Sequence, residues 1–206
     1  MCNFIVIKTR DKLIEVARQL FAHNGIENTT MNNIAEASDK GRRTIYTYFK
    51  NKREIYNAVI ASETEQMITK LQELATLPIP PESKLMNFIF VRFDAVKELV
   101  LRNGSLRAEF FRDVRKVERA RRCTTGREAA ILTQILAEGV EKGVFRIKHV
   151  EQTAMVMILS LQGLDVHYIR NNFAELGIER LKLREYIKDF IMYGIKKQAV
   201  TQQMNL

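Results

Sequence analysis

Proline is confined to one short stretch of this chain, and this confinement limits the folds open to it. Pro78, Pro80 and Pro81 are the three prolines among 206 residues, and the glycines stand singly between long amphipathic stretches. Apolar residues recur there every three or four positions, which is the period of an α-helix. No segment alternates apolar and polar residues for long enough to predict a strand. The sequence therefore predicts an all-α fold.

The proline cluster also separates two of the helices. Because a residue before proline avoids the helical conformation, we expect a helix over about 52–76 to end there and the next to open at Glu82 or Ser83. The remaining periodic stretches predict helices over 84–102, 105–119, 126–142, 151–171 and 179–199.

Residues 30–54 form the most informative segment, which reads as two short helices joined by a tight turn. Ile34 and Ala35 supply the inward face of the first helix. Ile45 and Phe49 are four residues apart and so share one face of the second. Thr30 stands just before this pattern, where an N-cap is expected.

The outer face of the second helix is basic and rich in hydroxyl groups. It begins with Lys40, Arg42 and Arg43 and continues with Thr44, Tyr46 and Tyr48, and Gly41 relaxes the backbone near its start. The second helix of a helix-turn-helix enters the major groove of DNA with such a face. An ordinary helical hairpin with a solvated basic face is the alternative.

Three segments carry a family resemblance: TRDKLIEVARQLFAHNG (9–25), TTMNNIAEAS (29–38) and TIYTYFKNKREI (44–55). Together they resemble the DNA-binding domain of the tetracycline-repressor (TetR) family of bacterial transcription regulators, and they align without a gap. The chain departs from the family in the turn. Asp39, Lys40 and Gly41 replace the usual Gly-Val-Ser, and Arg43 replaces a glycine.

The resemblance implies a three-helix helix-turn-helix domain over 1–54 and a helical effector-binding and dimerisation domain over 55–206. It implies a ligand-responsive transcriptional regulator, a repressor, that binds a palindromic operator in double-stranded DNA as a homodimer and is released by a small-molecule effector. The sequence names neither operator nor effector, and an activator would need the same reading head.

The expected DNA contacts follow from the same segment. Thr44 and Tyr46 are expected to touch bases, and Thr30, Tyr48 and Lys52 to hold phosphates. Arg42 and Arg43 suit either role, and Lys40 is also expected to contact DNA. A lysine near a helix N-terminus is disfavoured by the helix dipole unless an anion is present, so a phosphate would suit Lys52. The alternative is a surface lysine with its ammonium in water.

The C-terminal part carries a looser resemblance. EGVEKGVFR (138–146) is similar to the end of a TetR-family helix, and two apolar helices follow it. In that family the last two long helices pair with their mates in a four-helix dimer interface. The expected seam comprises Met157, Leu161, Leu164, Ile187, Ile191 and Ile195. Packing within one subunit is the alternative for each of them.

An effector pocket is likewise expected by resemblance. Its candidate lining is Phe90, Phe93, Phe110, Met155 and Gln162, although aromatic and methionine residues at helical spacing are more often core. Residues 107–127 hold eight Lys/Arg against three acids. This basic run fits either a solvated surface or a contact with an anionic effector or a phosphate.

The composition agrees with a nucleic-acid partner. The net charge is +9, and residues 1–56 hold ten Lys/Arg against six acids. Cys2 and Cys123 make no disulfide framework, which favours a reducing cytoplasm. No apolar run approaches the roughly 18 residues of a membrane span.

Metal-binding HExxH, hydrolase GxSxG and phosphate-loop motifs are absent, so we expect no enzyme, metal or cofactor. A helical module that binds anionic surfaces without sequence preference is the alternative function.

Overall fold

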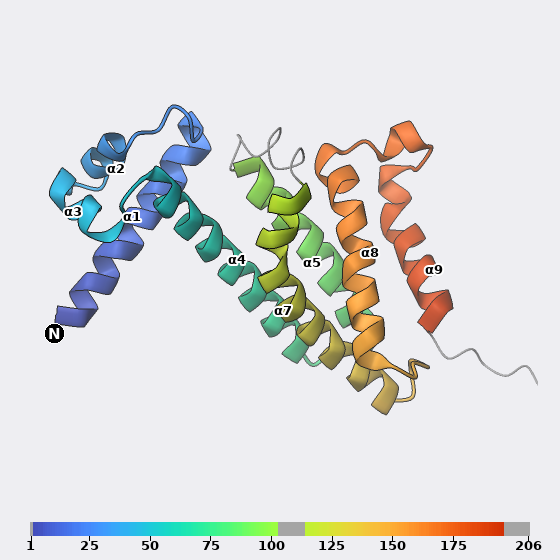
Figure 1. Ribbon diagram of the computed structural model, residues 1–206. Helices are drawn as coiled ribbons and strands as arrows, with labels where there is room; N and C mark the ends of the chain where they lie inside the picture. Colours follow the sequence, from blue (N-terminus) through green and yellow to red (C-terminus); the bar gives the residue numbers. More distant parts are fainter. Residues whose placement is uncertain (1, 103–113, 196–206) are drawn as a thin grey trace, which may run out of the picture. The chain divides into compact units, whose positions relative to one another are not determined.

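The computed structural model describes residues 2–102 and 114–195, and within these ranges the chain forms helices and no strand (Figure 1). The all-α prediction is confirmed. The chain divides into two compact units, residues 1–69 with 95–121 and residues 70–94 with 122–206. We call them the first and the second unit. Helices α4, α5 and α7 each contribute residues to both.

The first unit is built on α1 (Cys2–Asn24), α2 (Met31–Ala37), α3 (Arg42–Tyr48) and the first part of α4 (Lys52–Thr76). Helix α1 begins well before Thr9, because no proline or glycine interrupts the residues that precede it. All four helices contribute apolar side chains to one core. Its members include Leu13, Ala17, Phe21, Ile34, Ala35, Ile45, Phe49, Ile55 and Val59.

The second unit contains the end of α4 and parts of α5 (Pro81–Arg102) and α7 (Val114–Glu141), followed by α8 (Val150–Arg170) and α9 (Leu183–Ile195). Two short 3-10 helices, η1 (Phe173–Leu176) and η2 (Arg180–Lys182), connect α8 with α9. The interior is mainly apolar, and its apolar side chains come from the long helices of the unit. Its buried members include Leu71, Leu85, Phe88, Ile89, Phe93, Leu132, Ile135, Leu136, Ala154, Ile158 and Leu161.

Several predicted helix bounds need correction. Helix α5 opens at Pro81 and not at Glu82 or Ser83, because the fixed φ of proline suits the first helical position, where its missing N–H is not needed. The prediction of separate helices before and after Gly126 is wrong, since α7 runs through this glycine. Glycine weakens a helix interior by about 1 kcal/mol but does not by itself end it.

The other bounds agree more closely. Helix α4 matches the predicted 52–76, and α8 lies within a residue of the predicted 151–171. Helix α9 begins at Leu183, later than predicted, because the residues before it form η2. Residues 105–113 and 196–199 of the predicted helices lie outside the described residues.

Candidate nucleic-acid interface

Helix α2 begins with the N-cap that the sequence predicts. The Oγ1 of Thr30 accepts a hydrogen bond from the Asn33 backbone N at 3.1 Å, and the Thr30 backbone N donates to Asn33 Oδ1 at 2.9 Å. This reciprocal pair forms a capping box. It occupies the Thr30 hydroxyl, which also donates to Asn33 Oδ1 at 2.7 Å.

The turn between α2 and α3 is made at Asp39. This residue adopts φ 54°, in the left-handed region, and its backbone N donates to Glu36 O at 3.0 Å. The Lys40 backbone N donates to Ala35 O at 3.0 Å and completes the turn. Gly41 was expected to supply the turn conformation, yet it has an ordinary extended backbone with φ −65° as the N-cap of α3. The conformationally demanding position is therefore Asp39, and Lys40 precedes the helix.

Helix α3 buries one face and presents the other to solvent. Ile45 is fully buried and Phe49 is 3% exposed, as their spacing predicted. Arg42, Arg43 and Tyr46 are exposed. A helix of seven residues thus carries its two arginines and a tyrosine on the surface of a folded scaffold.

The remaining α3 candidates are more enclosed. Thr44 and Tyr48 are half-buried, and Tyr48 packs against the core of the first unit. The neighbouring Thr47 directs its hydroxyl to Arg43 O at 2.9 Å. The Tyr48 ring therefore contributes to packing, whatever its hydroxyl contacts.

Lys52 lies at the start of α4 with its side chain half-buried. Its Nζ donates to Ile26 O at 2.6 Å and to Glu27 O at 3.3 Å, in the loop between α1 and α2. The sequence suggested a phosphate or water as the partner of this ammonium. In the structure two backbone carbonyls accept from this ammonium, and the phosphate contact stays a prediction.

Arg10 is a cation near the reading helix that the sequence analysis did not single out. Its guanidinium carbon lies 5.5 Å from the centre of the Phe49 ring, at the C-terminal end of α3. Arg10 precedes Leu13 and Ile14 by three and four residues, so this exposed residue lies on the same face of α1 as that buried pair. That spacing was the signal available in the sequence.

Comparison with known proteins agrees with this geometry. Residues 13–59 match the family model of bacterial regulatory proteins, tetR family. The segment is similar to the probable acrEF/envCD operon repressor of Escherichia coli K12, at 45% identity over 51 residues, which are 25% of this chain and 23% of that protein. The match thus spans about a quarter of the repressor.

The N-terminal segment of this chain belongs to the tetR family of bacterial regulatory proteins.

Two further similarities extend beyond the segment that matches the family model. An uncharacterized HTH-type transcriptional regulator of Bacillus subtilis, YhgD, is 28% identical over 160 residues, covering 72% of this chain and 78% of its own length. The transcriptional regulator FadR of Bacillus subtilis, solved in complex with stearoyl-CoA, aligns with a TM-score of 0.62 at 20% identity, covering 89% of this chain and 97% of its own. The latter likeness supports the fold.

The candidate pocket residues differ in burial and in their contacts. Phe93 is buried and stacks on Tyr168 with ring centres 4.8 Å apart, and Phe90 lies under the Arg184 guanidinium at 4.8 Å. Gln162 donates to Thr125 Oγ1 at 2.9 Å. Met155 is exposed on α8, and Phe110 lies outside the described residues. The four described candidates belong to α5 and α8, and the pocket stays a prediction.

The candidate seam residues divide between the interior and the surface. Leu161 and Ile187 are 4% and 7% exposed, so both pack inside the second unit. Met157, Leu164 and Ile191 are half-buried, whereas the burial of Ile195 is not described. The exposed apolar side chains of the two helices are different ones. They are Met155, Val156 and Leu159 on α8 and Tyr186, Phe190 and Tyr193 on α9.

A buried ion cluster in the second unit escaped the sequence analysis. Arg92 of α5 donates through Nε to Glu128 at 2.7 Å and through Nη1 and Nη2 to Asp165 at 2.7 and 3.1 Å. All three side chains are at most 4% exposed. Burial alone lowers the pKa of Arg92, but the hydrogen bonds and charges of the two carboxylates outweigh it and raise that pKa. An arginine inside the apolar run 88–93 was the signal in the sequence.

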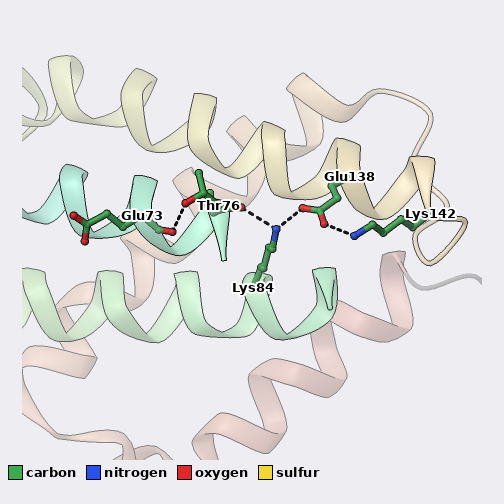
Figure 2. A network of polar contacts seen from close by, with 6 residues as sticks. Glu73, Thr76, Lys84, Glu138 and Lys142 are labelled. Atoms are coloured by element: carbon green, nitrogen blue, oxygen red, sulfur yellow. Dashed lines mark hydrogen bonds and ion pairs between the residues drawn. The ribbon is translucent and has the colours of Figure 1, made fainter. Parts of the chain in front are cut away.

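A second polar network joins three helix ends (Figure 2). Lys84, which is 5% exposed, donates to Ala75 O at 2.9 Å near the end of α4 and to Glu138 Oε2 at 2.7 Å near the end of α7. Lys142 donates to the other carboxylate oxygen at 2.6 Å. These two hydrogen bonds, first from Lys142 and then from Lys84, hold the pKa of Glu138 below its ordinary value.

Within residues 2–102 and 114–195, no helix has both the length and the apolar character needed to cross a membrane. No group of three or more His, Cys, Asp or Glu side chains in these ranges is arranged to hold a metal ion.

Proposed function

We propose that this tetR-family protein is a ligand-responsive transcriptional repressor that binds a palindromic operator as a homodimer. The observation that carries the proposal is α3, which anchors Ile45 in the core and leaves Arg42, Arg43 and Tyr46 exposed. An arginine at this place reads guanine O6 and N7 in the major groove, and such a pair gives about 1–3 kcal/mol of discrimination between bases.

The roles of the other reading-head residues are part of the proposal. Thr44 and Tyr46 touch bases, while Thr30, Tyr48 and Lys52 hold phosphates. Lys40 stands exposed directly before α3 and adds a cation beside Arg42 and Arg43. The division into a DNA-binding domain over 1–54 and an effector domain over 55–206 remains a prediction, as does a cytoplasmic location.

A dimer is needed because a palindrome presents two symmetry-related half-sites. The exposed apolar faces of α8 and α9 support a second copy as the partner, with Phe190 82% and Val156 61% exposed. We propose that the seam is formed by these exposed side chains and not by the buried Leu161 and Ile187. Phe190→Asp is expected to convert the dimer into a monomer, measured by sedimentation, while the helical content stays unchanged.

The effector is proposed to bind in the second unit. The Bacillus subtilis relative of the same fold, solved with stearoyl-CoA, supports a small-molecule ligand. Phe90, Phe93 and Gln162 remain candidates for its lining. Release would follow a population shift, in which the effector binds the DNA-incompetent arrangement better than the competent one.

Selection of bound duplexes from a random pool tests the function directly. The full-length protein is expected to enrich a palindrome with half-sites about one helical turn apart. Binding to that duplex should weaken with salt, with a log-log slope of about −0.9 for each phosphate neutralised. Equal retention of all sequences, together with binding to anionic vesicles, would instead favour a module that recognises anionic surfaces.

A further inference from the structure

The C-terminal end of α3 carries an aromatic ring that is held in place. Phe49 is the C-cap of this helix, and its backbone N donates to Ile45 O at 2.9 Å. Its side chain is 3% exposed and belongs to the core of the first unit. A group that rests on this ring therefore has a defined position relative to α3.

Arg10 rests on the ring from a different helix. Its guanidinium carbon lies 5.5 Å from the centre of the Phe49 ring. The face of an aromatic ring carries partial negative charge and attracts a guanidinium, so this contact orients the arginine. The Arg10 side chain is nevertheless exposed. Its charge is thus placed beside the reading helix and at the surface.

No carboxylate of α1 is positioned to pair with Arg10. Side chains that face each other on a helix stand three or four residues apart, and no acid stands at those distances from Arg10 in either direction. Asp11 is adjacent and so points elsewhere. Over residues 2–102 and 114–195, no hydrogen bond or ion pair engages the Arg10 guanidinium. Arg18, further along α1, differs because its Nε donates to Glu15 at 2.8 Å.

An exposed guanidinium on an aromatic ring suits a phosphate as its partner. Arginine stays charged, is weakly hydrated and presents its N–H donors in a planar fork that matches phosphate oxygens. In helix-turn-helix proteins of the homeodomain type, the C-terminal end of the reading helix contacts the DNA backbone. Phe49 and Arg10 lie at that end of α3, and the exposed Lys50 follows directly.

We propose that Arg10 contacts an operator phosphate beside the C-terminal end of α3, with the Phe49 ring holding its guanidinium in place. This inference rests on the proposed DNA-binding function. It adds α1 to the elements that meet DNA, and it extends the contacted backbone beyond the bases assigned to Arg42 and Arg43.

The test is the salt dependence of binding to the duplex that the wild-type protein selects. Arg10→Met keeps an unbranched side chain able to cover the Phe49 ring, but it removes the charge and the donors. We expect the affinity at low salt to fall about tenfold for all sequences alike, and the log-log slope to fall in magnitude by about 0.9 for each protomer bound. An unchanged slope would overturn the proposal. Failure of the wild-type protein to select any duplex would instead refute the DNA-binding function.

Lys12→Met is the matched control. Lys12 is also an exposed cation of α1, and two residues along a helix turn its side chain to nearly the opposite side from Arg10. The variant loses the same charge, so any effect of the overall field on DNA binding would appear in both variants. We expect its slope to equal that of the wild type. Equal reductions in the two variants would contradict a specific contact at Arg10.

Phosphate ethylation locates the contact on the duplex. Ethylation of the phosphate that Arg10 contacts should interfere with binding of the wild-type protein and should no longer interfere with binding of Arg10→Met. An identical interference pattern for the two proteins would overturn the proposal. Arg10→Lys, which keeps the charge, is expected to retain the wild-type slope.

Urea unfolding without DNA separates a phosphate contact from support of α3. Arg10 is exposed, so Arg10→Met is expected to unfold at nearly the wild-type urea concentration. A clear loss of stability together with an unchanged slope would show that Arg10 only supports the packing of Phe49.

Discussion

The ring of Phe145 occupies the place that a Cβ on residue 139 would need. A Cβ built on Gly139 would lie 2.9 Å from Cγ of that ring and closer still to two other ring carbons. The Val144 and Phe145 backbone N–H groups both donate to Gly139 O, at 2.9 and 3.0 Å. Gly139 within EGVEKGVFR is thus explained by packing, because the chain folds back over its own helix there.

Gly139→Ala should therefore destabilise the protein, although alanine is the better helix former. Overpacking of this kind costs about 1–3 kcal/mol, more than the ~1 kcal/mol gained in helix propensity. Urea unfolding measures the difference. Gly126→Ala, in the same helix with open space around the Cβ position, is the control and should stabilise the protein.

Asp39 carries the turn of the reading head at φ 54°. Asp39→Asn should be nearly neutral, because asparagine tolerates the left-handed region. Asp39→Val should cost about 1–2 kcal/mol, because a β-branched Cβ crowds the backbone there. Thermal unfolding and operator affinity should fall together in the valine variant. Equal stability of the two variants would show that this turn does not constrain the fold.

Replacing Arg42 and Arg43 is expected to change the base preference of DNA binding, whereas replacing Tyr48 is expected to change only the affinity. Replacing both arginines by alanine should relax base preference at particular operator positions, because the guanidinium groups read base edges. Tyr48→Phe should weaken all sequences alike. Selection from a random duplex pool with each variant distinguishes these results. Unchanged affinity and site preference in the double variant would refute α3 as the reading helix.

Asp165→Asn should be strongly destabilising, because it leaves the buried Arg92 with a weakened partner. Removing one member of a buried ion pair costs about 3–5 kcal/mol, so a loss near 3 kcal/mol is expected with the amide oxygen retained. The control is Asp94→Asn, an exposed carboxylate that accepts from Tyr168 Oη at 2.6 Å. Chemical denaturation should show a large loss of unfolding free energy for Asp165→Asn and a small one for Asp94→Asn.

The Glu138 network predicts a loss of stability in acid. Its pKa in the folded protein lies below the ordinary 4.5, so the carboxylate stabilises the fold above that pH. This contribution declines as the pH falls from 4.5 through the folded-state pKa. Glu138→Gln should flatten the dependence of the unfolding free energy on pH in this window. Glu141→Gln removes the same charge from an exposed position of α7 and serves as the control.

The sequence by itself determined the all-α fold, the N-cap at Thr30 and the buried face of α3. These features depend on local pattern, because cap chemistry and helical periodicity are set by residues a few positions apart. The same locality explains why α4 and α8 were bounded closely. It also explains the errors at Pro81 and Gly126, because the surrounding structure decides whether a proline or glycine begins, interrupts or only weakens a helix.

Only the tertiary structure decided which groups far apart in sequence meet. It paired Arg92 with Glu128 and Asp165, gave Lys52 the carbonyls of Ile26 and Glu27 as partners, and buried Leu161 and Ile187 while exposing Phe190. Periodicity reveals that a helix has an apolar face, but its burial depends on which neighbours cover it. The partner of a charge likewise depends on distances in space, which the spacing of residues along the chain does not contain.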